Sequence, residues 1–204
     1  MQNSILALAA SPLVYVGMYL FATIDGFFPP IPSESLAIAL AALSAASGRP
    51  NMALIIVAAA AGAFTGDQIA YSIGKWLPVS RIPLLRGGRG RRTLNWAERT
   101  LARRGASFIL AARYIPVGRV AVNMTSGAVG YPRRRFIGLV AIASITWALY
   151  SAAIGVGAGI WFKGHPVGAV VVGVITGLLF GLVIDWTLRR LAYRKDSQTE
   201  AELR

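Results

Sequence analysis

The chain alternates long apolar stretches with short polar ones, and this pattern predicts an all-helical membrane protein. Four stretches are apolar for long enough to cross about 30 Å of hydrocarbon, at about 1.5 Å of helical rise per residue. They span residues 5–22, 51–76, 136–162 and 167–188. We therefore expect four transmembrane helices in a single membrane domain, residues 1–204, because no polar linker divides the chain.

Two further apolar segments are each interrupted by proline and by charged residues. The helical pieces after these breaks cover residues 33–46 and 117–129, and at roughly 20 Å each they are too short to cross. Re-entrant hairpins, which enter and leave on the same side, are the simpler interpretation. We predict them at about residues 24–47 and about 107–130, entering from opposite faces. Such an inverted repeat is a recurrent transporter design.

Composition agrees with a membrane protein and narrows the possible chemistry. The 204 residues are 55% hydrophobic and 14% charged, and the mean hydropathy is +0.58, as in polytopic membrane proteins. The chain has no cysteine, which excludes disulfides and thiolate chemistry, and its single histidine, His165, excludes multi-histidine metal sites. We expect neither a metal nor a cofactor.

The net charge of +13 comes from basic residues in short loops and does not indicate nucleic-acid binding. Eight arginines lie between residues 81 and 104, and three more lie at residues 133–135. Basic loops mark the cytoplasmic side, and both clusters fall there only if the second hairpin does not cross. We therefore predict a cytoplasmic basic loop at about residues 78–105, a cytoplasmic tail at about 189–204, and both termini in the cytoplasm.

The charged residues inside the first break are candidates for proton coupling. A charge at bilayer depth costs roughly 3 kcal/mol even on the most lenient scale, so it needs a partner and usually a task. Asp25 and Glu34 bracket the prolines of this break. Burial favours a protonated acid and a nearby arginine favours its carboxylate, so such groups can be poised to exchange protons. Capping of the half-helix by Ser33, with Glu34 beside it, is the structural alternative.

The second break contains Arg113 and Arg119. Arginine suits phosphate because its planar fork donates two parallel hydrogen bonds and stays charged. The following half-helix adds positive potential at its N-terminus. In the alternative interpretation both arginines only pair with Asp25, Glu34 or Asp67 and hold the hairpins together.

Two polar residues elsewhere complete the candidate set. Asp67, in the second long span, is a candidate for proton coupling or for a structural salt bridge, and Asn123 is a candidate for lining a substrate site. Small-residue stripes permit close helix contact, either within the chain or in a homodimer. They consist of Gly155 and Gly159, and of Gly173, Gly177 and Gly181.

Together these motifs resemble the DedA family, the bacterial branch of the VTT-domain membrane proteins. The resemblance covers about residues 25–159, and Ser126-Gly127 departs mildly from the Ala-Gly of many relatives. The matching motifs are Asp25-Gly-Phe-Phe-Pro-Pro, Pro32-Ser-Glu34, Gly66-Asp67 with Tyr71 and Gly74, Arg113-Tyr-Ile-Pro with Arg119, and Ser126-Gly127 leading to Gly130-Tyr-Pro-Arg-Arg-Arg-Phe136.

The resemblance implies a flippase that returns a polyprenyl-phosphate carrier lipid across the bacterial inner membrane and depends on the proton gradient. On this basis we expect an anionic lipid (undecaprenyl or decaprenyl phosphate) and protons as partners. Arg113 and Arg119 would hold the phosphate, and Asp25, Glu34 and Asp67 would handle protons.

Other functions remain open at the level of sequence. They are a proton- or cation-coupled exporter of small solutes and, as in distant relatives of the family, a phospholipid scramblase. A slot that opens sideways to lipid would favour a lipid substrate, because a polyprenyl tail cannot be enclosed. A lipid phosphatase fits poorly, since the chain has one histidine and no phosphate-loop motif. We therefore expect a transporter and not an enzyme.

Overall fold

The structure is a computed structural model, and it describes residues 11–28, 31–76, 88–113 and 116–161. Within these ranges every regular element is a helix, so the all-helical prediction is confirmed there. The predicted span at 167–188, the tail at 189–204 and the stripe formed by Gly173, Gly177 and Gly181 lie outside the described residues. The described helices are α2 Leu13–Asp25, α3 Ser33–Ser47, α4 Met52–Trp76, α6 Gly88–Ala112, α7 Pro116–Ala128 and α8 Arg133–Trp161.

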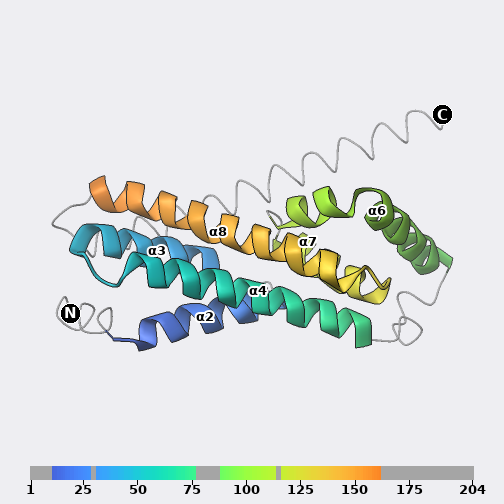
Figure 1. Cartoon of the computed structure of the whole chain (residues 1–204), viewed down its shortest axis with the longest axis horizontal. Coiled ribbons are helices and arrows are strands. Elements are labelled where there is room, and N and C mark those ends of the chain that lie inside the picture. Colours follow the sequence, from blue (N-terminus) through green and yellow to red (C-terminus); the bar gives the residue numbers. More distant parts are fainter. Residues whose placement is uncertain (1–10, 29–30, 77–87, 114–115, 162–204) are drawn as a thin grey trace.

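Helices α4 and α8 form the frame of the fold. Both are long and apolar enough to cross a bilayer, judged by length and composition. They run side by side in opposite directions, with α3 along one half of the frame and α7 along the other (Figure 1). Helix α8 starts at Arg133, earlier than the predicted start at residue 136, so the arginine run lies in its first turn.

Helices α2 and α3 are the two limbs of the first hairpin. The backbone N–H of Asn51 donates to Tyr15 Oη at 2.8 Å, so α2 begins beside the start of α4. Further along, Thr23 Oγ1 donates to the carbonyl of Gly62 at 3.2 Å, so α2 and α4 run in the same direction. The chain then turns back, and α3 returns to the starting end, where Gly48 in the left-handed conformation (φ 73°) closes it.

This arrangement differs from the predicted division of the N-terminal half. We predicted a crossing helix at residues 5–22 and a hairpin from residue 24. Helix α2 has 13 residues, about 20 Å of helix, and it ends beside the middle of α4, so its described part is a hairpin limb and not a span. The sequence of an apolar run does not distinguish a transmembrane span from a limb of a hairpin. Residues 1–10 lie outside the described part, and the count of four spans stays a prediction.

The second hairpin stands at the opposite end of the frame. Helix α6 bends at Arg104, whose φ of −137° and ψ of 28° interrupt the helix. After the bend Gly105 packs against the ring of Tyr131, close to the start of α8. Helix α7 returns to this same end, where Gly130 is left-handed (φ 70°). The two hairpins thus lie at opposite ends of the frame, whereas their entry from opposite faces of a bilayer stays a prediction.

Glycines let the hairpins pack closely on the frame. A Cβ on Gly155 of α8 would lie 2.5 Å from the carbonyl oxygen of Ile38 in α3. A Cβ on Gly74 of α4 would collide with the backbone of Met124 in α7. Small residues of this kind allow helices in a membrane to approach backbone to backbone. Gly155 therefore serves packing within the chain, one of the two alternatives predicted for its stripe.

Candidate functional site

The breaks of the two hairpins meet near Asp67 of α4. The Asp67 side chain is 1% exposed and forms an ion pair with Arg113, whose Nη1 donates to Oδ2. Asn123 Nδ2 donates to the other oxygen, Oδ1, at 2.8 Å. Arg119 Nε lies 3.8 Å from the same Oδ1. One buried carboxylate therefore organises three side chains of the second hairpin.

Asp25, the last residue of α2, ties the first hairpin to the second. Its Oδ1 lies 3.2 Å from Arg119 Nη2, and the same nitrogen donates to the Asp25 backbone carbonyl at 2.6 Å. Ser33 donates its hydroxyl to Asp25 Oδ2. The predicted cap at Ser33 is wrong: Pro32 occupies the N-cap position, without a side-chain cap hydrogen bond, and Ser33 is the first helical residue. The hydroxyl serves the carboxylate of Asp25 instead.

Glu34 stands apart from this ion-pair cluster. It accepts a hydrogen bond at 3.0 Å from Tyr150 Oη, which comes from α8. Among the described residues it forms no ion pair with either arginine. Among the described residues the arginines therefore pair with Asp25 and Asp67 but not with Glu34, and whether pairing is their only role stays open.

Arg113 keeps an unused hydrogen-bonding edge. Its Nε and Nη2 are buried and have no hydrogen-bond partner among the residues that the structure describes. These nitrogens share one edge of the guanidinium, which can donate two parallel hydrogen bonds to a single anion. The cation also lies over the ring of Trp147, with Cζ 5.3 Å from the ring centroid. Because an unsatisfied buried donor costs about 1–3 kcal/mol, an anion at this edge would relieve a penalty.

An apolar groove of about 190 Å³ lies beside Arg113, between the end of α6 and the middle of α8. Among the described residues that line it, Arg113 alone is charged. Ile142 and Thr146 on its α8 side are exposed, the former by 59%. The described residues therefore leave the groove open at the side of the frame. Its lining consists of Leu110, Arg113, Ile142, Ala143, Thr146 and Trp147.

The cluster holds balanced charges when all its groups are ionised. Arg113 and Arg119 face the carboxylates of Asp25 and Asp67. The two carboxylates already pair with the arginines, so an added anion would give the cluster a net negative charge. Burial makes such an unbalanced charge costly. Protonation of one carboxylate would free a guanidinium for the anion. Uptake of a proton by the cluster therefore favours binding of an anion, and loss of the proton favours its release.

The structure brings five of the six predicted site residues into contact, and their roles stay predictions. Sequence reasoning missed Trp147 and Tyr150, which contact Arg113 and Glu34 from α8. A signal for Tyr150 was present, because a tyrosine hydroxyl inside an apolar span needs a hydrogen-bond partner. The residues in contact are Asp25, Asp67, Arg113, Arg119 and Asn123.

Comparison with known proteins identifies the family. The family model of the VTT domain matches residues 31–157. An alkaline phosphatase-like protein of Lactococcus lactis subsp. cremoris (strain MG1363) is 26% identical over 152 residues, which cover 71% of each chain. The protein of the same description from Lactococcus lactis subsp. lactis (strain IL1403) matches to the same extent. No solved structure matches the chain. The match over 31–157 includes α3, α4, α6 and α7 and most of α8, and the chain therefore belongs to the VTT-domain family of membrane proteins, the DedA family.

Proposed function

We propose that the protein is a transporter that moves an anionic lipid across the membrane. The observation that carries this proposal is the free edge of Arg113, with Nε and Nη2 unpartnered among the described residues, beside a groove with apolar walls. A phosphate would accept two hydrogen bonds from this edge. Its hydrocarbon chain would leave sideways along the groove. A small soluble substrate would gain no favourable contact from apolar walls that open at the side of the frame.

Polyprenyl phosphate is our best candidate for the lipid, and this choice comes from the family resemblance. A phospholipid would present the same phosphate to Arg113 and the same kind of chain to the groove. Lipid scrambling and polyprenyl-phosphate transport therefore share one site and differ in substrate range and in dependence on the proton gradient. The transport assay below separates them.

In the proposed cycle, protons act through the carboxylates that compete with phosphate for the arginines. Asp67 occupies Nη1 of Arg113, and Asp25 occupies Nη2 of Arg119. A proton on either carboxylate weakens its ion pair and releases the guanidinium for phosphate. Loss of that proton restores the ion pair and displaces the phosphate. A ligand shifts such an equilibrium only by its differential affinity for the two arrangements. Here the proton binds better to the arrangement in which the guanidinium is released, and so shifts the equilibrium toward it.

The proposed arrangement in the membrane places the exchange near the midplane. Helices α4 and α8 cross the bilayer, and the two hairpins enter from opposite faces with their breaks meeting between them. The arginine-rich end of the frame, with residues 133–135, lies on the cytoplasmic side of the bacterial inner membrane. A further span at residues 167–188 would return the tail to the cytoplasm.

The test uses purified full-length protein in liposomes with an imposed proton gradient. Labelled polyprenyl phosphate, phosphatidylglycerol and phosphatidylcholine are followed by their accessibility to a reductant added outside. We expect gradient-dependent movement of polyprenyl phosphate, its loss in Arg113→Gln, and its retention in Arg99→Gln. Arg99 is the matched control, because it is an exposed arginine of α6 that does not contact the cluster.

Other outcomes would replace the proposal by a named alternative. Movement of all three lipids without a gradient would make the protein a scramblase. Release of inorganic phosphate from polyprenyl phosphate would indicate a phosphatase, the activity suggested by the name of the Lactococcus lactis relatives.

A further inference from the structure

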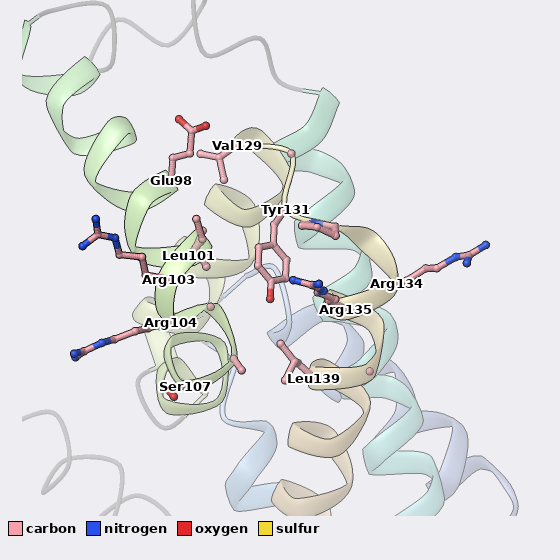
Figure 2. A pocket seen from close by; sticks show the side chains of 16 residues that line it. Glu98, Leu101, Arg103, Arg104, Ser107, Val129, Tyr131, Arg134, Arg135 and Leu139 are labelled. Carbon is pink, nitrogen blue, oxygen red and sulfur yellow. The ribbon is translucent and has the colours of Figure 1, made fainter.

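A basic hollow, separate from the apolar groove beside Arg113, lies at the end of the frame where α7 is followed by α8 (Figure 2). It has a volume of about 840 Å³ and lies between the bent part of α6 and the first turns of α8. We propose that this hollow binds the phosphate headgroup of an anionic membrane lipid at the membrane surface. The proposal does not depend on the transport function, because neither Arg113 nor Arg119 lines the hollow.

Four arginines surround the hollow, and a single acidic residue, Glu98, accompanies them in its described lining. Arg103 and Arg104 belong to α6, and Arg134 and Arg135 belong to α8. All four are exposed, and none forms an ion pair with a residue that the structure describes. Their donors are therefore available to phosphate oxygens. The excess of positive charge favours an anion over a neutral ligand.

The close view shows how these side chains lie. Arg135 lies beside the ring of Tyr131 at the centre of the hollow, whereas Arg103, Arg104 and Arg134 extend outward at its margin (Figure 2). A headgroup that settles against Tyr131 would thus meet Arg135 first. The marginal arginines would attract it over a longer range, as basic residues near an anionic membrane do.

The wall of the hollow is held in place without a ligand. A Cβ on Gly105 would lie 2.7 Å from the Tyr131 ring, so the absence of a side chain lets the ring pack against α6. The Tyr131 carbonyl accepts a hydrogen bond from Tyr71 Oη at 2.6 Å, and its N–H donates to the carbonyl of Ser126 at 2.9 Å. Because these contacts fix Tyr131, binding there would require little reordering of the chain.

The position of the hollow points to a lipid and not to a soluble anion. Helix α8 passes from its arginine run to an apolar sequence at Phe136, which is fully buried in the frame. The hollow therefore lies where the polar headgroups of a bilayer would be. Beyond the arginines its lining continues with Gly138 and Leu139, a small and an apolar residue along which acyl chains can begin. Such basic clusters beside a membrane helix are typical of anionic-lipid binding.

The first arm of the test removes charge from the hollow. Detergent-purified protein is titrated with phosphatidylglycerol, with phosphatidylcholine and with inorganic phosphate, and bound lipid is counted by native mass spectrometry. Arg104→Gln/Arg135→Gln removes two arginines of the hollow. Arg99→Gln/Arg133→Gln is its matched control, because it removes two exposed arginines from the same two helices outside the described lining.

The second arm fills the hollow without changing charge. Gly138 lines the hollow, and a Cβ there meets no atom within 4 Å, so Gly138→Leu adds bulk at the wall of the hollow. Gly157→Leu is the control, because Gly157 also lies on α8, has open space and does not line the hollow. Transport of labelled lipid by Gly138→Leu reports separately on the central site.

We expect phosphatidylglycerol binding to weaken about fivefold for each arginine removed from the hollow, and also in Gly138→Leu, with both controls close to the wild type. Phosphatidylcholine binding should not change. Equal losses in the two double variants would overturn the proposal, since attraction would then come from diffuse surface charge. Displacement of phosphatidylglycerol by millimolar inorganic phosphate would overturn the choice of a lipid. Unchanged binding in Gly138→Leu would show that the hollow is not the site.

Discussion

Asp67 and Arg113 form an ion pair in which the side chains are 1% and 3% exposed, between α4 and the break of the second hairpin. The pair uses one nitrogen of the guanidinium and leaves Nε and Nη2 without a partner among the described residues. Asp67 can therefore stabilise the hairpin and at the same time compete with an anion for Arg113. Stabilising the hairpin favours ligand binding, whereas competing for Arg113 opposes it. A measurement of binding can therefore separate the two effects.

Asp67→Asn should tighten polyprenyl-phosphate binding and abolish the response of transport to the proton gradient. The amide keeps the shape of the side chain but no longer competes as an anion, so the affinity should rise by about tenfold. The thermal midpoint in detergent should fall, because removing one partner of a buried pair costs about 3–5 kcal/mol. Lipid binding is measured by native mass spectrometry of the detergent-solubilised protein. Weaker binding in Asp67→Asn would mean that Asp67 supports the ligand and does not compete with it.

Arg119→Ala should weaken phosphate-lipid binding at every pH, because it removes a permanent cation and a two-pronged donor. Arg119 also holds the Asp25 carbonyl and carboxylate through one nitrogen. Lysine at this position should restore binding only in part, since a point charge lacks the planar fork. The comparison uses equilibrium lipid binding by wild type, Arg119→Ala and Arg119→Lys. Unchanged binding in Arg113→Ala/Arg119→Ala would exclude the proposed phosphate site.

The positions of α3 and α7 and most of the candidate site were predictable because proline and charge interrupt apolar runs, whereas α2 and α6 do not follow the predicted span at 5–22 and loop at 78–105. The half-helix predicted at 33–46 is Ser33–Ser47, and the one predicted at 117–129 is Pro116–Ala128. A charged residue within such a run had to be buried, so Asp67 and Arg119 could be selected without a structure. These predictions depend only on the residues within each segment.

Partner choice was not predictable, because it depends on which segments meet in space. Arg119 donates to a residue 94 positions earlier in the chain, and Glu34 accepts from a residue 116 positions later. A buried charge requires a partner but does not specify which one. The same limit explains the error at Ser33: serine before a helix predicts a cap, but a neighbouring carboxylate competes for the same hydroxyl.

Gly74→Leu should destabilise the protein, because a side chain there would collide with the backbone of Met124 in α7. Overpacking of this kind costs about 1–3 kcal/mol, so the thermal midpoint in detergent should fall by several degrees. Gly157→Leu is the control, since a Cβ there meets no atom within 4 Å. Equal midpoints for the two variants would show that α4 and α7 do not depend on this contact.

Single cysteines at Gly88 and Arg134 should both react with a membrane-impermeant thiol reagent from the cytoplasmic side alone. The chain contains no cysteine, so each label reports one position. The second hairpin lies between these positions, and equal sidedness requires that it does not cross. Labelling of the two positions from opposite faces would contradict the proposed topology. Labelling of intact cells and of inverted vesicles provides the two directions of access.

Substitutions of the carboxylates of the first hairpin should change lipid binding and transport differently from substitutions of the arginines. The two carboxylates should also differ from each other. Glu34→Gln keeps the shape of the side chain and imitates the protonated acid, so lipid should still bind while transport loses its response to the gradient. Tyr150→Phe should produce part of this effect, because it removes the hydrogen bond to Glu34 without changing charge. Asp25→Asn should in addition loosen Arg119, its ion-pair partner, and so increase lipid affinity.

The double variant Asp25→Asn/Glu34→Gln decides whether the two carboxylates serve one proton step. They occupy separate contacts in the structure, so independent action predicts losses of transport that add on a free-energy scale, and a shared step predicts a double variant no worse than the more severe single one. Initial rates of gradient-driven lipid movement in liposomes provide the comparison, with lipid binding measured on the same preparations. Normal gradient-driven transport with both carboxylates neutralised would remove them from the proton step and leave Asp67 as the group through which protons act.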